Sequence, residues 1–115
     1  MKLPKRDKIV VTLSTFPKKL PAERAARTLV KEKLAACAWV LPAMNSFYRW
    51  QGKLVADREN VLVVKTRESL VKAVEARLHE LHPYTVPEFI VLPATYVSKK
   101  YLDWALSVTR GKTPD

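Results

Sequence analysis

The chain has 115 residues, of which 48% are hydrophobic and 28% charged, a balance typical of one folded soluble domain rather than of a disordered chain. No apolar run approaches the roughly 20 residues that a membrane-spanning helix needs, and no signal peptide follows the basic N-terminus, so we expect a cytoplasmic protein with no membrane partner. One cysteine excludes an internal disulfide, and two glycines are too few for a glycine-rich phosphate-binding loop.

The formal net charge of +10 strengthens contact with any polyanion through counterion release. The basic residues are dispersed, however, and several have the helical spacing that is typical of solvated helix faces. We therefore expect nucleic acid to bind only non-specifically, with dedicated nucleic-acid binding as an open alternative. Few glycines, eight prolines and many basic residues are also typical of a thermostable protein.

The first half of the chain predicts a strand, a helix and a long hairpin. Residues 9–14 form a β-branched, apolar run that predicts a strand. Pro21 fits the first turn of a helix whose apolar residues recur every three or four positions. Residues 37–50 are extended, and the turn Gln51-Gly52 joins them to a second extended segment that ends at Thr66. Polar residues 57–60 predict an interruption of that second segment.

The second half predicts two helices separated by a strand. Glu68 lies in the first turn of one helix, where it meets the positive end of the helix dipole. Pro83 ends this helix because it has no N–H to donate and restricts the residue before it. Residues 86–92 predict a strand, and Ser98 predicts the N-cap of a last helix.

The element order β-α-β-β-α-β plus a terminal helix predicts an α+β fold, a ferredoxin-like sandwich with two helices on one face of an antiparallel sheet. We expect a single domain over residues 1–115, with a core at about 9–108, a basic N-terminal tail and a short C-terminal tail. The two hairpin strands, at about 12 residues, are longer than the usual five or six.

The part of the hairpin that the helices cannot cover carries large apolar side chains: Trp39, Leu41, Phe47, Tyr48 and Trp50. An exposed apolar strand pair is an aggregation hazard unless another chain covers it. We therefore expect a closed homo-oligomer. The alternative is a bent hairpin that folds back on its own core.

Several motifs follow one another along the chain. They are Leu34-Ala35-Ala36-Cys37, Ser46-x-Tyr48-x-Trp50-x-Gly52, Glu59-x-x-Leu62-x-x-Lys65-Thr66, His82-Pro83-Tyr84-x-Val86-Pro87-Glu88 and Tyr101-Leu102-x-Trp104. Together they resemble the CutA family of divalent-cation tolerance proteins. The resemblance implies a homotrimer related in architecture to PII signalling proteins, with clefts between subunits that bind a divalent metal ion or a small ligand in response to metal ions.

The residues that carry these motifs are the candidate site. We predict a site for a divalent metal ion, with copper the first choice because a thiolate suits Cu(I), at His82, Cys37, Glu59 and Glu88. We predict a ligand-binding cleft at the aromatic and basic members of the set: Tyr48, Trp50, Lys65, Tyr84 and Trp104. Of the two histidines, we expect His79 to be solvent-exposed and His82 to be the better ligand.

Structural alternatives stay open for these residues. Cys37 could be a small buried hydrophobe, and Glu59 and Glu88 could form ion pairs with Lys65 or Arg67. The aromatic residues could belong to a core or an interface. Nothing places a nucleophile beside a base, so we expect no enzymatic activity and no organic cofactor. The alternative function is a PII-like trimeric signalling or interaction protein without direct metal chemistry.

Overall fold

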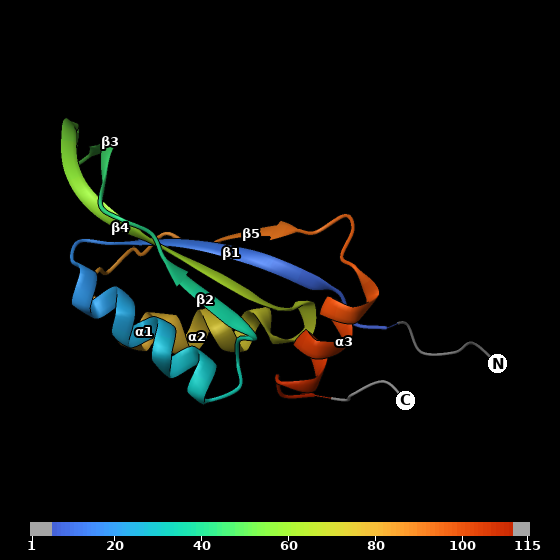
Figure 1. The fold of residues 1–115 in the computed structure, drawn as a ribbon. Helices are drawn as coiled ribbons and strands as arrows, with labels where there is room; N and C mark the ends of the chain where they lie inside the picture. Colours follow the sequence, from blue (N-terminus) through green and yellow to red (C-terminus); the bar gives the residue numbers. More distant parts are fainter. Residues whose placement is uncertain (1–5, 112–115) are drawn as a thin grey trace.

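The computed structural model describes residues 6–111. In chain order the elements are β1 (Ile9–Phe16), α1 (Lys19–Lys31), β2 (Cys37–Val40), β3 (Met44–Trp50), β4 (Lys53–Arg67), the 3-10 helix η1 (Glu68–Leu70), α2 (Val71–Leu81), β5 (Ile90–Pro93) and α3 (Lys99–Ser107). The strands form an antiparallel sheet in the order β2-β4-β1-β5, and β3 pairs with β4 beyond the end of β2. Helices α1 and α2 lie side by side on one face of this sheet (Figure 1). The predicted ferredoxin-like α+β fold is confirmed.

The core lies between the sheet and the two helices. Successive strand residues point to opposite faces, so Val10 and Phe16 of β1 and Leu62 and Val64 of β4 face the helices, and each is at most 2% exposed. The apolar face of α1 meets them, and Pro21 lies in its first turn as predicted. A second, smaller cluster packs α3 beside the start of β1: Ile9, Ala36, Ala105 and Leu106.

The hairpin departs from the sequence-based prediction in two ways. Residues 41–43 belong to no strand, so the first segment becomes the two strands β2 and β3. The second segment is not interrupted: β4 runs for 15 residues through the polar stretch 57–60. The predicted break was wrong because backbone pairing does not depend on side-chain polarity. Glu59 pairs with Met44 and Asn60 with Phe16, and the Asn60 amide donates to the Leu41 carbonyl oxygen at 3.1 Å.

Two element boundaries also differ. Strand β5 begins at Ile90, four residues later than predicted, because residues 84–88 turn aside to line a cleft. Pro87 in that stretch has no N–H for a ladder hydrogen bond. Ser98 occupies the predicted N-cap position of α3, but its side chain makes no capping hydrogen bond. The end of α2 is as predicted, since His82 before Pro83 has extended backbone angles.

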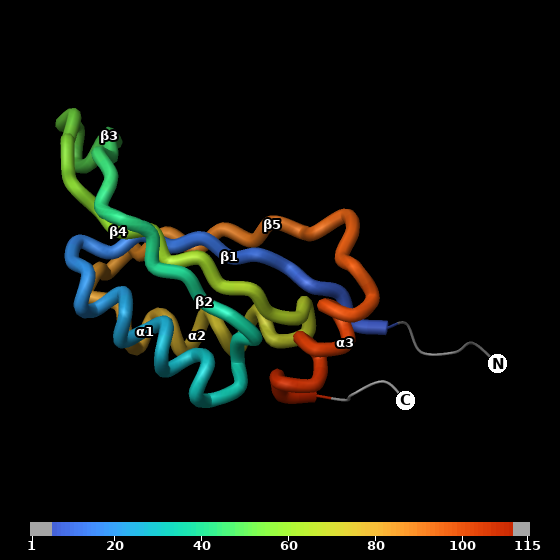
Figure 2. The backbone as a smooth tube through the Cα atoms, viewed as in Figure 1, coloured from blue at the N-terminus to red at the C-terminus, as the bar shows by residue number. Residues whose placement is uncertain are grey.

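The turn at Gln51 and Gly52 is as expected. Both residues have positive φ, 49° and 77°, the combination of the type I′ turn that suits the twist of a two-residue hairpin. The hairpin of β3 and β4 that this turn closes curves up and away from the body of the domain (Figure 2). Large apolar side chains there are open to solvent: Phe47 is 71% and Leu54 74% exposed.

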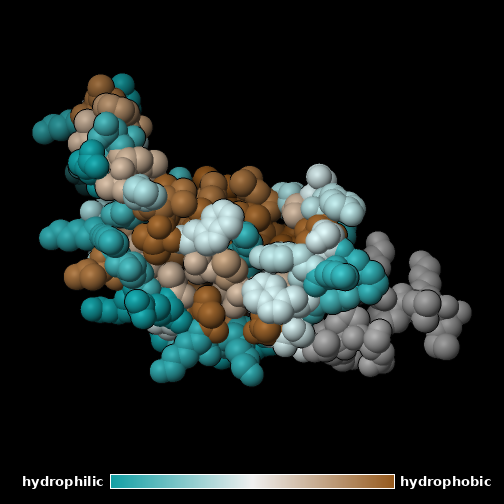
Figure 3. Space-filling model, in the orientation of Figure 1, coloured by the Kyte–Doolittle hydropathy of each residue, from teal (hydrophilic) through white to brown (hydrophobic). Residues whose placement is uncertain are grey.

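The sheet face opposite α1 and α2 has no cover in the described chain. By the strand registers, Val11 and Leu13 of β1, Trp39 of β2, and Ile90 and Leu92 of β5 point to this face. Trp39, Ile90 and Leu92 are each 45–48% exposed. Figure 3 shows hydrophobic side chains gathered along this side of the molecule and again on the hairpin. We call this surface, with these five residues, the open sheet face.

Candidate functional site

A cleft of about 630 Å³ lies where the hairpin curves away from the body. Its apolar floor is the open face of the sheet at Leu13 and Val61. Tyr48 and Trp50 of β3 line it from the hairpin, and Tyr84 lines it from the connection between α2 and β5. Three of the five predicted cleft residues therefore share this cavity, and Tyr48 and Trp50, two apart on β3, point to the same side of the hairpin.

Two carboxylates also line the cleft, Glu59 on β4 and Glu88 on the connection before β5. Glu59 is only 4% exposed, and the Tyr84 hydroxyl donates a long hydrogen bond of 3.4 Å to its Oε2. Burial, and then the nearby Glu59 charge, raise the pKa of Glu88. Burial is also the main cause of the raised pKa of Tyr84, with the Glu59 charge adding to it. The cleft therefore disfavours added negative charge.

Tyr48 extends this polar network toward solvent. Its hydroxyl donates to Asp57 at 2.5 Å, and this hydrogen bond is the main cause that raises the pKa of Tyr48 to about 12. Asp57 and Glu59 are two apart on β4 and so point to the same face of the hairpin. The tyrosine thus keeps its proton at neutral pH, and its one O–H is given to Asp57, which fixes the phenol at the rim of the cleft.

His82 supports the cleft from behind. Its Nδ1 accepts the Tyr84 backbone N–H at 3.0 Å, so the proton is on Nε2, which donates to the Thr15 carbonyl oxygen at 2.7 Å. Its ring packs between those of Phe16 and Tyr84, with centroids 4.2 and 4.9 Å away. Burial lowers the pKa of His82 against the opposing effect of the Thr15 carbonyl. Both ring nitrogens are occupied, so this conformation does not present His82 as a metal ligand; His79 is exposed, as predicted.

The remaining predicted site residues lie at the other end of β4. Cys37 pairs with Lys65 across the strands, and Lys65 is six residues from Glu59, or ~20 Å along a strand. The Lys65 ammonium lies 3.8 Å from the centre of the Trp39 ring rather than against a carboxylate. Trp104, on α3, is 44% exposed and packs on Tyr101. Within one chain, therefore, the cleft does not include Cys37, Lys65 or Trp104.

The four predicted metal ligands do not converge within one chain. Among residues 6–111 there is no group of three or more His, Cys, Asp or Glu side chains placed to hold a metal ion. The suggested ion pairs of Glu59 and Glu88 are not formed either, because neither carboxylate contacts a cationic side chain in this part of the protein. Cys37 is partly exposed rather than buried.

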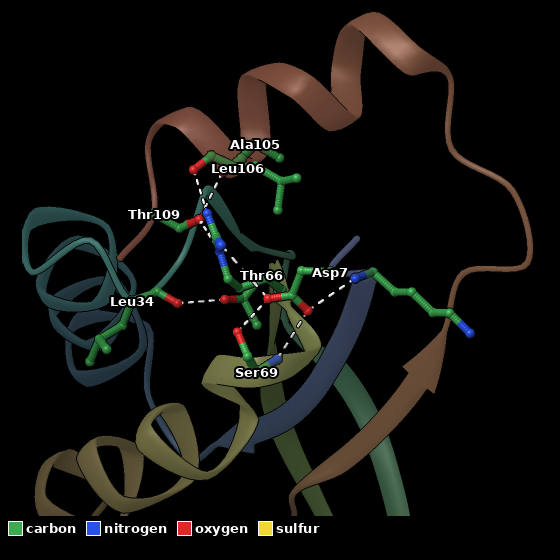
Figure 4. Close-up of polar contacts among 9 residues, drawn as sticks. Asp7, Leu34, Thr66, Ser69, Ala105, Leu106 and Thr109 are labelled. Atoms are coloured by element: carbon green, nitrogen blue, oxygen red, sulfur yellow. Dashed lines mark hydrogen bonds and ion pairs between the residues drawn. The ribbon is translucent and has the colours of Figure 1, made fainter. Parts of the chain in front are cut away.

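A buried polar cluster around Arg67 escaped sequence analysis. Arg67 is 2% exposed; it donates to the Thr109 hydroxyl at 2.9 Å and to the Leu106 carbonyl oxygen, and pairs with Asp7 at 3.7 Å. Asp7 in turn accepts from the Ser69 hydroxyl (Figure 4). The cluster fastens α3 and the segment before β1 to the end of β4. No local pattern indicates it, because its members lie far apart in the sequence.

Comparison with known proteins assigns the family. The chain matches the family model of the CutA1 divalent ion tolerance protein over residues 10–108. It is 45% identical over 94 residues to the divalent-cation tolerance protein CutA of Thermus thermophilus, covering 82% of this chain and 91% of that protein. The chain belongs to the CutA1 family. The cleft of this CutA1 family member is therefore built largely from motif residues that the family resemblance had singled out.

Two further similarities describe the extent of the match. The chain is 41% identical over 102 residues to the chloroplastic protein CutA of Arabidopsis thaliana; these are 89% of this chain but 56% of that longer protein. The crystal structure of CutA1 from Oryza sativa superimposes with a TM-score of 0.88 at 40% identity, covering 91% of this chain and 96% of that one. The CutA1 fold thus extends over the whole body of this protein and its hairpin.

Proposed function

We propose that this CutA1 family member is a non-enzymatic homotrimer that binds a divalent metal ion or a small ligand at clefts between subunits, as part of a response to metal ions. One observation carries the proposal: the acidic, aromatic cleft opens on the same side of the sheet as the uncovered apolar surface. A second copy packed on the open sheet face would form the outer wall of the cleft. The site would then exist in full only in the assembly.

Assembly is supported by the amount of apolar surface that a single chain leaves in water. The open sheet face and the curved hairpin together expose more large apolar side chains than a monomer of this size ordinarily does. Identical chains related by closed symmetry cover such surfaces without leaving a new exposed edge. A homotrimer accounts for both surfaces if each hairpin lies against the next subunit.

Metal binding needs the assembly for a separate reason. One chain offers two carboxylates in the cleft and, about 20 Å away, one partly exposed thiol, so a complete set of ligands must combine donors from two chains. Copper is the metal for which a thiolate donor would matter. The net charge of +10 disfavours non-specific accumulation of cations, so binding must come from directed ligands.

The test combines assembly and metal content. Sedimentation equilibrium at micromolar concentration should give three chains per particle, and calorimetric titration with Cu²⁺ and Zn²⁺ should reach a fixed ratio of metal to subunit. Glu59→Gln should weaken that binding, whereas Glu75→Gln, on α2 behind the sheet, should not. A monomer would contradict the assembly. A trimer that takes up no metal in a fixed ratio would instead favour the PII-like alternative.

A further inference from the structure

Glu59 is a nearly buried carboxylate without a counterion. It is 4% exposed, and the one hydrogen bond to its carboxylate among residues 6–111 is the 3.4 Å bond from Tyr84 to Oε2, which leaves Oε1 without a protein donor there. Other acids in this part of the chain pair with cations: Glu32 with Arg77 and Asp103 with Lys99. Removing a carboxylate from water is costly unless a donor or a cation compensates. Within residues 6–111, therefore, no cationic side chain compensates the charge of Glu59 in the cleft.

The walls of the cleft indicate what kind of cation fits. Tyr48, Trp50 and Tyr84 present aromatic rings beside the two carboxylates, and such rings attract ammonium and guanidinium groups through their π faces. The floor at Leu13 and Val61 is apolar. A cavity of about 630 Å³ has the size of a small-molecule site. A bare metal ion fills little of this space, and residues 6–111 of one chain offer it no set of three donors.

The polar groups of the cleft are held in place before any ligand arrives. The Tyr84 backbone is fixed by its hydrogen bond to His82, and its ring packs on the imidazole. The Tyr48 hydroxyl is fixed by Asp57. Because these groups are already ordered, a ligand loses less affinity to the ordering of side chains.

We propose that the cleft binds a small organic cation, an ammonium or guanidinium group on an apolar stem. The charge lies between Glu59 and Glu88, against the ring of Tyr84, and the stem lies on Leu13 and Val61. This inference rests on the proposed function, since it names the chemical class of the small ligand for the same cleft. It goes beyond that function because the bound charge is organic rather than a metal ion.

The experiment uses two probes of nearly equal shape, 2-phenylethylammonium and the neutral 2-phenylethanol, titrated calorimetrically into the full chain at its native oligomeric state. We expect the ammonium to bind at least about tenfold more tightly than the alcohol. Glu59→Gln should remove this difference and leave the alcohol unaffected, and Glu75→Gln should retain it. Glu88→Gln, at a more exposed carboxylate, should reduce it, and it provides the test if Glu59→Gln does not fold.

Other outcomes overturn the proposal. Equal affinity for the two probes would show that the cleft binds only their apolar part and does not recognise the positive charge. Ammonium binding that survives both glutamine substitutions would place the site elsewhere. If wild-type protein ignores the ammonium and Glu59→Gln dissociates the oligomer, a basic side chain of a second copy fills the site. Sedimentation tests whether the protein is a trimer, and a parallel Zn²⁺ titration tests whether it binds metal. Both are independent of the ammonium titration, so failure of the proposed function is distinguishable from failure of this inference.

Discussion

A charge placed on the open sheet face should dissociate the assembly while leaving the single chain folded. Leu92 on β5 is 46% exposed in one chain, so Leu92→Glu keeps its carboxylate partly in water and should change monomer stability little. In an assembly that covers this face, the same carboxylate loses its water. Desolvation of an ion in a protein costs several kcal/mol, and the lost leucine burial adds about 1 kcal/mol more.

The symmetry of the assembly multiplies this effect. With a conservative penalty of about 3 kcal/mol per subunit, three equivalent sites destabilise a trimer by about 9 kcal/mol, or roughly six orders of magnitude in the association constant. Sedimentation equilibrium at about 10 µM should therefore report monomers for Leu92→Glu. Far-UV circular dichroism should still show a folded chain.

Leu20→Glu is the matched control. Leu20 is more exposed than Leu92, at 73%, but it belongs to α1 on the covered side of the sheet. This variant should assemble like the wild type. If Leu92→Glu also remains assembled, the open sheet face is not an interface. If both variants dissociate, the dissociation results from the change in net charge rather than from the position of the substituted residue.

Three further substitutions test local features. Burial lowers the pKa of His82, so its neutral form stabilises the fold above pH 6.5, the ordinary imidazole pKa, and this stabilisation is lost as the pH falls from there through the folded pKa. His82→Ala should therefore make the unfolding free energy, measured by urea titration, decline less steeply with falling pH. An unchanged decline would contradict the lowered pKa of His82. Asp7→Asn removes the carboxylate that lies 3.7 Å from the buried Arg67 guanidinium and should lower the unfolding free energy by about 2 kcal/mol, whereas Asp103→Asn at an exposed pair should lower it by at most about 1 kcal/mol. Gln51→Asn, at a φ of 49°, should raise stability by about 0.5 kcal/mol in guanidinium denaturation, and a loss would argue against the type I′ turn.

Features set by neighbouring residues could be predicted from the sequence. Pro21 and the apolar repeat located α1, Pro83 located the end of α2, and Gly52 located the hairpin turn. Each signal acts within a few residues through fixed φ values or helical spacing. The predicted break at residues 57–60 was wrong because it was inferred from the polar composition of that stretch. Its backbone pairs with β1 and β3, which no local signal reports.

The site could be predicted only in part for the same reason. The motifs include Tyr48, Trp50 and Tyr84, which share one cleft in the structure, but motif spacing could not show that Lys65 and Trp104 lie at the opposite end of β4. Two residues on one strand can share a site only if few residues separate them, because each residue adds about 3.3 Å along the strand. The two hydrogen bonds of His82 depend on tertiary contact with β1 and on the turn after α2.

The place of β1 in the sheet has a consequence for biosynthesis. β1 is a central strand, yet Ile9 pairs with Arg67 and Leu13 with Ile90, so both of its neighbours are translated long after it. While the ribosome makes the segment between, this β-branched run has no partner, and unpaired apolar strands are templates for aggregation. Closing such distant contacts also slows folding. The sheet can therefore be completed only after β5 has left the ribosome, and we expect nascent chains that stop before residue 90 to depend on chaperones for their solubility.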